Sequence, residues 1–123
     1  MLALVALAAP ARADDCNKLS SDVALFQSEQ DGFMRERNRV SAMNPAPTQD
    51  VALCRALRMY AADAPYFLIA DTDHPSCFKD EQQAKAFVDY VHEIYINVGT
   101  LVGGYCSDEE LKCPVQSKVL GAE

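Results

Sequence analysis

Residues 84–102 read AKAFVDYVHEIYINVGTLV, and this stretch carries the clearest structural signal in the chain. Its apolar side chains recur every three or four residues, which is the period of one face of a helix. They are Ala84, Phe87, Val88, Val91, Ile94, Tyr95, Val98, Leu101 and Val102. Asp80 and Gln83 form a capping pair before the stretch, and Gly103-Gly104 after it is typical of a helix end. The stretch therefore predicts one long amphipathic helix.

Residues 18–43 predict another long helix. Their apolar groups follow a series of alternating four-residue and three-residue steps, in which the polar Gln30 and Arg37 take two of the inward places. The apolar members are Leu19, Val23, Phe26, Phe33 and Val40. Asn44-Pro45-Ala46-Pro47 ends this helix, because proline disfavours helical geometry in the residue before it and has no backbone N–H to donate.

A third helix is predicted between these two, with Thr48 as its N-terminal cap. Its expected inner face consists of Val51, Cys54, Leu57, Ala61 and Leu68. Pro65 is expected to kink or divide it, and residues 71–76 have the composition of a turn. No segment alternates with the period of a strand over a useful length, so the fold class is all-α.

Three helices joined by short connections predict an up-down-up bundle. Ser107 and Glu110 predict a short C-terminal helical turn after the third helix. We expect a single helical domain over residues 14–116 and a flexible tail over residues 117–123.

Residues 1–13 resemble the end of an export signal, because an apolar run is followed by the small residues Ala11 and Ala13. We interpret them as a signal-peptide remnant that is removed by cleavage; an apolar helix start packed on the core is the alternative. The run is shorter than the roughly 20 apolar residues that cross a bilayer, so no stable membrane insertion is expected. The protein is predicted to be extracytoplasmic, in a bacterial periplasm or secreted.

The chain has 123 residues and a formal net charge of −7. An acidic field repels nucleic acid and anionic membrane surfaces, so neither is an expected partner. A chain of this length builds one domain, and a domain this small gains from cross-links between its cysteines.

The five cysteines predict a pair of disulfides, since none of their spacings is typical of a metal, haem or redox motif. In an up-down-up bundle Cys16 and Cys77 lie at one end, which predicts a Cys16–Cys77 bond. Cys54 lies at the other end with Cys106 and Cys113, so we expect Cys54–Cys106 and, as second choice, Cys54–Cys113. A full break at Pro65 would instead allow Cys54–Cys77 together with Cys106–Cys113.

Cys113 is the expected odd thiol. We favour a buried or incidental role for it, ahead of a disulfide-linked dimer and ahead of chemistry.

No catalytic residues, no metal site and no cofactor are predicted. The chain has no GxSxG, HExxH, GxxxxGK or GxGxxG motif. His74 stands between acidic residues and Cys77, a combination that can bind a transition metal, but a polar turn with an oxidised cysteine is the preferred interpretation. His92 fits a solvated helix face.

The candidate partner-binding residues are Tyr66, Phe67, Arg35 and Arg39. The two aromatic residues belong to a dense apolar run near an expected end of the bundle. The two arginines form a basic patch that can receive a carboxylate or a phosphate. The leading hypothesis is an exported, non-enzymatic binding module that acts on a protein partner, as an inhibitor or immunity-like protein does. The alternative is a carrier of a small molecule or metal, using an inter-helix pocket or the His74 loop.

Overall fold

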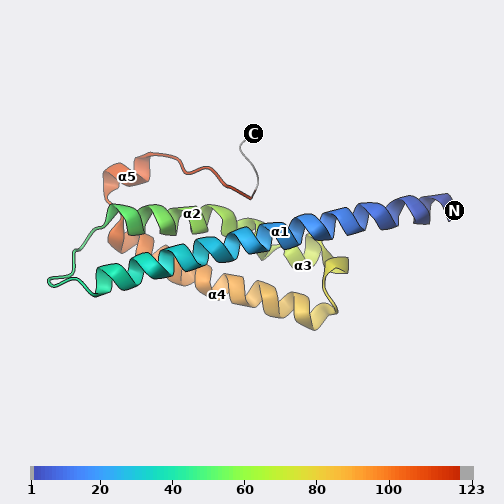
Figure 1. Ribbon diagram of the computed structural model, residues 1–123, viewed down its shortest axis with the longest axis horizontal. Helices are drawn as coiled ribbons and strands as arrows, with labels where there is room; N and C mark the ends of the chain where they lie inside the picture. Colours follow the sequence, from blue (N-terminus) through green and yellow to red (C-terminus); the bar gives the residue numbers. More distant parts are fainter. Residues whose placement is uncertain (1, 120–123) are drawn as a thin grey trace.

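Three long helices run antiparallel in the computed structural model, which describes residues 2–119 and the side chains of residues 15–119. They are α1 (Leu2–Ser41), α2 (Val51–Leu68) and α4 (Glu81–Tyr105). The short α3 (Ala70–Asp73) and the 3-10 turn η1 (Pro75–Cys77) connect α2 to α4, and α5 (Asp108–Lys112) follows α4. Figure 1 shows the chain reversing its direction from α1 to α2 and again from α2 to α4. The predicted all-α bundle is confirmed, including its C-terminal helical turn.

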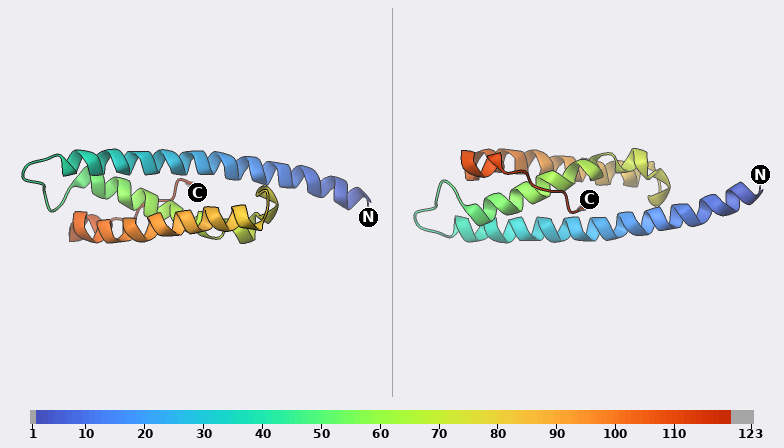
Figure 2. Two further views of the ribbon diagram at one scale, coloured as in Figure 1. Left: turned by 90° about the horizontal axis from the view of Figure 1, so that it is seen from below. Right: turned by 90° about the horizontal axis from the view of Figure 1, so that it is seen from above.

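Helix α2 packs against both α1 and α4, and the two views in Figure 2 show its long neighbours on either side of it. From α1 it receives Leu19, Phe26, Phe33 and Val40, which stand seven residues apart and are all buried. A strict seven-residue repeat keeps one seam of a helix facing its neighbour over several turns. The seam predicted from residues 18–43 is therefore the inner face of α1.

The buried face of α2 agrees with the expected one at Cys54 and Leu57 and differs elsewhere. It consists of Leu53, Cys54, Leu57, Tyr60, Asp63, Ala64 and Phe67. Val51, expected inside, is exposed. A four-three series that starts at Leu53 collects the large rings of Tyr60 and Phe67, and burying these rings removes more apolar surface from water than burying Val51 and Ala61.

An aromatic cluster fills the space between α1 and α2. The ring of Phe26 stacks on Tyr60 at a centroid distance of 4.3 Å and on Phe67 at 4.4 Å. Phe33 meets the Tyr60 ring edge-on at 5.2 Å. Stacked and edge-on contacts are the favourable geometries for aromatic pairs, so this cluster fixes how the two helices face each other.

The N-cap of α2, the C-terminal end of α4 and the continuity of α2 through Pro65 differ from what the sequence predicted. The N-cap of α2 is Asp50 rather than Thr48, because the Asp50 side chain accepts a hydrogen bond from Leu53 N. Pro65 is exposed and lies inside α2 without dividing it. Helix α4 continues past Gly103-Gly104 to Tyr105, because neither glycine adopts the left-handed conformation that ends a helix. The predicted cap of α4, Asp80 Oδ1 accepting from Gln83 N, is present.

Disulfides join the helices at both ends of the bundle. Cys16 of α1 is bonded to Cys77 of η1, with their Cα atoms 5.2 Å apart. Cys54 of α2 is bonded to Cys106 at the end of α4, with a Cα separation of 5.0 Å. These are the pairs that helix topology predicts. A local Cys54–Cys77 bond is not formed because α2 carries Cys54 away from the end of the bundle where Cys77 lies.

The remaining cysteine, Cys113, is unpaired and exposed, so a buried role for this thiol is wrong. It follows α5, which a capping box of Ser107 and Glu110 starts as predicted. The guanidinium of Arg58 on α2 donates to the carbonyl oxygens of Glu110 and Cys113. This double contact fixes α5 and the residue after it against α2, while the Cys113 side chain stays in solvent.

The two described ends of the chain are arranged differently, since the C-terminal end packs on the bundle and the N-terminal end of α1 extends beyond it. After α5 the chain runs back along α2 (Figures 1 and 2), and the side chain of Val119 is only 5% exposed. Residues 117–119 are thus docked rather than loose; residues 120–123 lie outside the described part. At the other end α1 is continuous from Leu2 through the expected cleavage point and extends past the other helices in Figure 1.

Candidate functional site

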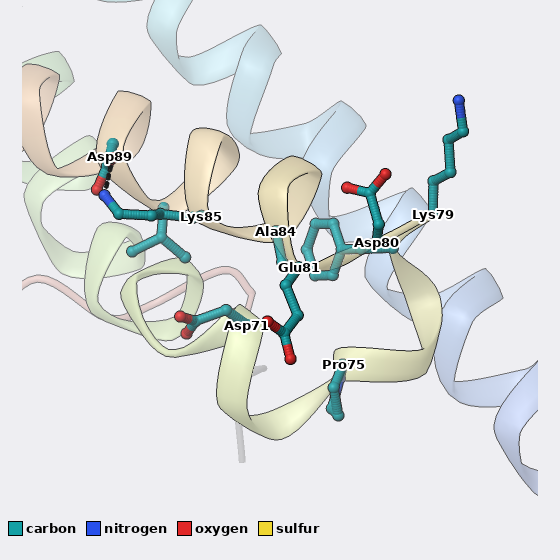
Figure 3. Close-up of a pocket in the computed structure, with 10 residues that line it drawn as sticks. Asp71, Pro75, Lys79, Asp80, Glu81, Ala84, Lys85 and Asp89 are labelled. Carbon is teal, nitrogen blue, oxygen red and sulfur yellow. Dashed lines mark hydrogen bonds and ion pairs between the residues drawn. The ribbon is translucent and has the colours of Figure 1, made fainter.

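A cleft of about 720 Å³ lies between α3 with η1 on one side and the first turns of α4 on the other (Figure 3). Its lining combines apolar side chains with charged ones. The lining residues are Asp71, Pro75, Phe78, Lys79, Asp80, Glu81, Ala84, Lys85, Val88 and Asp89. Three other hollows on the described part of the chain are smaller, at about 340, 530 and 290 Å³.

Backbone hydrogen bonds and one disulfide hold the walls of this cleft. On one wall the N–H groups of Thr72 and Asp73 donate to the carbonyl of Ile69, which forms the single turn of α3. On the other wall Asp80 caps α4, while the Gln83 side chain accepts from Lys79 N at 2.6 Å. The Cys16–Cys77 bond attaches η1 to α1. These hydrogen bonds and the disulfide therefore hold both walls of the cleft in place.

The floor of the cleft is apolar. Ala84 is buried against the bundle, and Phe78 packs on Phe87 of α4 with ring centroids 5.8 Å apart. Val88 is half-buried one helical turn further along α4. Such a floor offers a contact surface to the hydrocarbon part of a ligand.

The rim is acidic and part of it is unpaired. Lys85 forms an ion pair with Asp89 at 2.5 Å, and the amine of Lys79 points away from the space between α3 and α4 in Figure 3. Asp71 and Glu81 project into that space from opposite walls. Within residues 15–119, no basic side chain forms an ion pair with either of them. Two carboxylates are thus left to attract a cation from outside.

The chemistry of this cleft is that of a receptor for positive charge. Ionised carboxylates only accept hydrogen bonds, and they match the donors of ammonium and guanidinium groups. The lining contains no hydroxyl, thiol or imidazole side chain, and its polar side-chain groups are carboxylates and amines.

Of the predicted partner-binding residues, Tyr66 lies near this end of the bundle and is half-buried. Its hydroxyl lies 3.4 Å from Nε2 of His74, and Lys18 Nζ lies 5.5 Å from the centre of its ring. Phe67 is 0% exposed, so its prediction as a partner-facing residue is wrong. Its place in the four-three series of α2 directs it onto Phe26 and into the core. The exposed apolar residue of this run is Ile69, at 50%.

The two predicted arginines lie in the last two turns of α1, and neither lines the cleft. Arg39 pairs with Glu36 at 2.9 Å and with Asp50 at 2.7 Å. Hydrogen bonds from Leu53 N and then from Arg39 lower the pKa of Asp50. Arg35 is exposed. The structure therefore does not bring Tyr66, Arg35 and Arg39 into one site, and Arg39 has a structural partner.

The His74 loop does not assemble a metal centre among the described residues, where no group of three potential ligands is found. The sulfur of Cys77 is bonded to Cys16 and the imidazole of His74 faces Tyr66. The sequence analysis did not single out Asp71, which lies in the predicted turn of residues 71–76, or Glu81, which follows the predicted cap Asp80. The available signal was the group of carboxylates in and just after that turn.

No protein family model, no curated protein and no solved structure matches this chain. In the part of the chain that the structure describes, none of the helices has both the length and the apolar character needed to cross a bilayer.

Proposed function

We propose that this protein is an extracytoplasmic, non-enzymatic binding module whose cleft receives a lysine or arginine side chain of a protein partner. The observation that carries this proposal is a pair of carboxylates above an apolar floor, Asp71 and Glu81, which form no ion pair with a basic side chain of residues 15–119. Asp71 Oδ1 accepts one hydrogen bond, from Thr72 Oγ1 at 3.2 Å, which leaves its charge uncompensated. A module of this kind acts by covering a basic surface of its partner, which is how an inhibitor or immunity-like protein works.

A long basic side chain fits this cleft better than a compact cation does. Lysine and arginine have aliphatic stems that pack on apolar surface while the charged head stays among polar groups. In this cleft the stem would lie on Phe78 and Val88, and the head would lie between Asp71 and Glu81. Charge-assisted hydrogen bonds to carboxylates are stronger than neutral ones, which gives the contact its specificity for cations.

The disulfides support an extracytoplasmic location. Bonds such as Cys16–Cys77 and Cys54–Cys106 persist in oxidising compartments and are rare in the cytosol of most cells. The apolar run and small residues at positions 2–13 agree with an export signal at this end of the chain.

Chemical-shift mapping tests the proposal. A short lysine-rich peptide is titrated into the isotope-labelled protein, and a matched glutamate-rich peptide serves as the negative control. We expect the lysine peptide to shift amide signals of α3 and of the first turns of α4, and the Asp71→Asn/Glu81→Gln double variant to lose these shifts. The control variant Asp31→Asn/Glu109→Gln removes the same charge from exposed positions outside the cleft. Shifts that survive in the cleft variant, or that disappear equally in both, contradict the proposal.

A carrier of a small organic cation is the second candidate, because about 720 Å³ lies within the usual range of roughly 300–1,000 Å³ for small-molecule pockets. Native mass spectrometry with spermidine separates the two. Binding of spermidine that excludes the lysine peptide, with tighter affinity than the peptide, favours the carrier. Absence of spermidine binding eliminates it.

The exposed thiol of Cys113 also suits an intermolecular bridge. We propose that oxidised protein forms a dimer through it. Wild-type protein that runs as a monomer on a non-reducing gel, as Cys113→Ser does, eliminates this idea.

A further inference from the structure

A buried carboxylate fastens the C-terminal segment to α2. Asp63 is 0% exposed, and its Oδ1 accepts hydrogen bonds from Ser117 Oγ at 2.6 Å and from Val119 N at 3.2 Å. The side chain of Val119 is part of the core. A carboxylate is rarely buried this fully unless its contacts compensate for lost hydration. The second oxygen of Asp63, Oδ2, therefore also needs a hydrogen-bond donor.

That second oxygen faces Glu29 of α1. Asp63 Oδ2 and both side-chain oxygens of Glu29 are buried and have no hydrogen-bond donor among the described residues when both groups are ionised. An ionised carboxylate only accepts, whereas a protonated one also donates. One proton on Glu29 supplies the missing donor and forms a Glu29–Asp63 hydrogen bond. It also removes the repulsion between two buried negative charges.

The groups around this pair come from every element packed on it. Asp63 and the buried Tyr60 hydroxyl come from α2, and Tyr60 is influenced in turn by Tyr90 of α4. Lys118 of the C-terminal segment is the cation that acts on Glu29 and opposes its protonation. Arg55 of α2 lines the same hollow of about 340 Å³ as Glu29 and Lys118.

We propose that Glu29 and Asp63 share a proton that holds residues 114–119 against α2, and that loss of this proton releases the segment. Ionised Glu29 leaves two adjacent carboxylates of which one is fully buried, and the arrangement relieves this repulsion most easily by letting solvent in where Ser117 and Val119 close the site. The released segment would further expose the half-buried Met59, which now lines a hollow of about 530 Å³ with Arg55 and residues 114–118.

The direction of the pH response follows from the environment of Glu29. Burial first, then the hydrogen bond and the charge of Asp63, raise the pKa of Glu29 from 4.5 to about 8. The proton is retained below that pH and lost above it. The segment is therefore expected to be held in neutral and acidic solution and released in mildly alkaline solution.

Hydrogen exchange of the C-terminal segment tests this inference. After correction for the intrinsic effect of pH, we expect amides of residues 115–119 to exchange at least about tenfold faster near pH 9 than near pH 6. Glu29→Gln keeps a donor for Asp63 without a titrating group, so its segment should stay protected at both pH values. Asp31→Asn, an exposed neighbour on α1, should keep the wild-type response.

A direct titration complements the exchange measurement. The carboxyl carbon signal of Glu29 should titrate with a pKa of about 8. An ordinary glutamate pKa, unchanged protection of the wild-type segment between the two pH values, or equal release in Glu29→Gln would each overturn the proposal.

Discussion

Asp50 and Tyr105 join the beginning of α2 to the end of α4, because Asp50 N donates a hydrogen bond to the carbonyl oxygen of Tyr105 at 3.1 Å. The Cys54–Cys106 bond lies one turn further along α2, at the same end of the bundle. This end is therefore held by a covalent link, a backbone hydrogen bond and the helix cap that Asp50 provides.

Removing the two disulfides should have unequal effects on stability. Each bond closes a loop of more than fifty residues, with separations of 61 and 52, and a loop of this size predicts about 4 kcal/mol. Cys54 and Cys106 are also buried, so Cys54→Ala/Cys106→Ala additionally leaves a cavity. Urea unfolding should show a larger loss for this pair than for Cys16→Ala/Cys77→Ala. Equal losses, or wild-type protein insensitive to a reducing agent, would contradict this assignment.

Asp50→Ala should destabilise the protein by about 1 kcal/mol, since it removes the N-cap of α2. Thr48→Ala is the matched control and should have almost no effect. The pKa of Asp50 is lowered in the folded state, so its stabilising contribution is present above the ordinary aspartate value of 3.8 and is lost as the pH falls below it. Thermal unfolding at acid and neutral pH measures both effects. A larger loss of stability for Thr48→Ala than for Asp50→Ala would show that Thr48 is the N-cap, as the sequence predicted.

Phe67→Ala should cost about 3–5 kcal/mol, because Phe67 is fully buried against Phe26. Tyr66→Ala should cost roughly 1 kcal/mol, as expected for a half-buried residue. Denaturant midpoints of the two variants give the comparison. If the Phe67→Ala protein were as stable as wild type, Phe67 would not be part of the core.

The free energy of unfolding of the whole domain should depend on pH through the ionisation of Glu29. A raised folded-state pKa means that its contribution is complete below pH 4.5 and is lost as the pH rises toward about 8. Because the Glu29 residue as a whole is only half-buried, we expect the loss to be about 1–2 kcal/mol, well below the full value of such a shift. The difference in unfolding free energy between wild type and Glu29→Gln, followed across this range, isolates the term; a pH-independent difference would contradict it.

The bundle and its disulfide ends follow from local sequence signals. A seven-residue repeat from Leu19 to Val40 and a capping pair at Asp80 define helices without reference to the rest of the chain. Once three helices with short connections are defined, topology decides which cysteines are neighbours.

The docked C-terminal segment could not be predicted in this way. Asp63 meets Ser117 and Val119 across sequence separations of 54 and 56, and no local pattern reports such a contact. Asp63, an acidic residue inside the apolar stretch of α2, was the sequence feature that could have indicated a buried polar contact. The face of α2 was misassigned for a related reason, because alanine and leucine fit several helical phases and the aromatic packing partner on α1 decides among them.

The cleft is likewise a product of tertiary structure. Asp71 belongs to the short α3 and Glu81 to the first turn of the long α4, and the path of η1 between them brings both to one cleft. The sequence indicated a turn over residues 71–76, whereas the short helix α3 and then η1 form there. The accumulation of unpaired negative charge there appears only when the partners of the neighbouring lysines are known.

Isothermal titration of a lysine-rich peptide into wild-type protein, Asp71→Asn/Glu81→Gln and Asp31→Asn/Glu109→Gln tests the cation-receiving cleft most directly. The two variants have the same net charge, so their comparison separates a local site from the general acidic field. We predict that the cleft variant binds at least about tenfold more weakly than the control variant, and that added salt weakens wild-type binding. Equal affinities for the two variants would show that the cleft is not where the peptide binds.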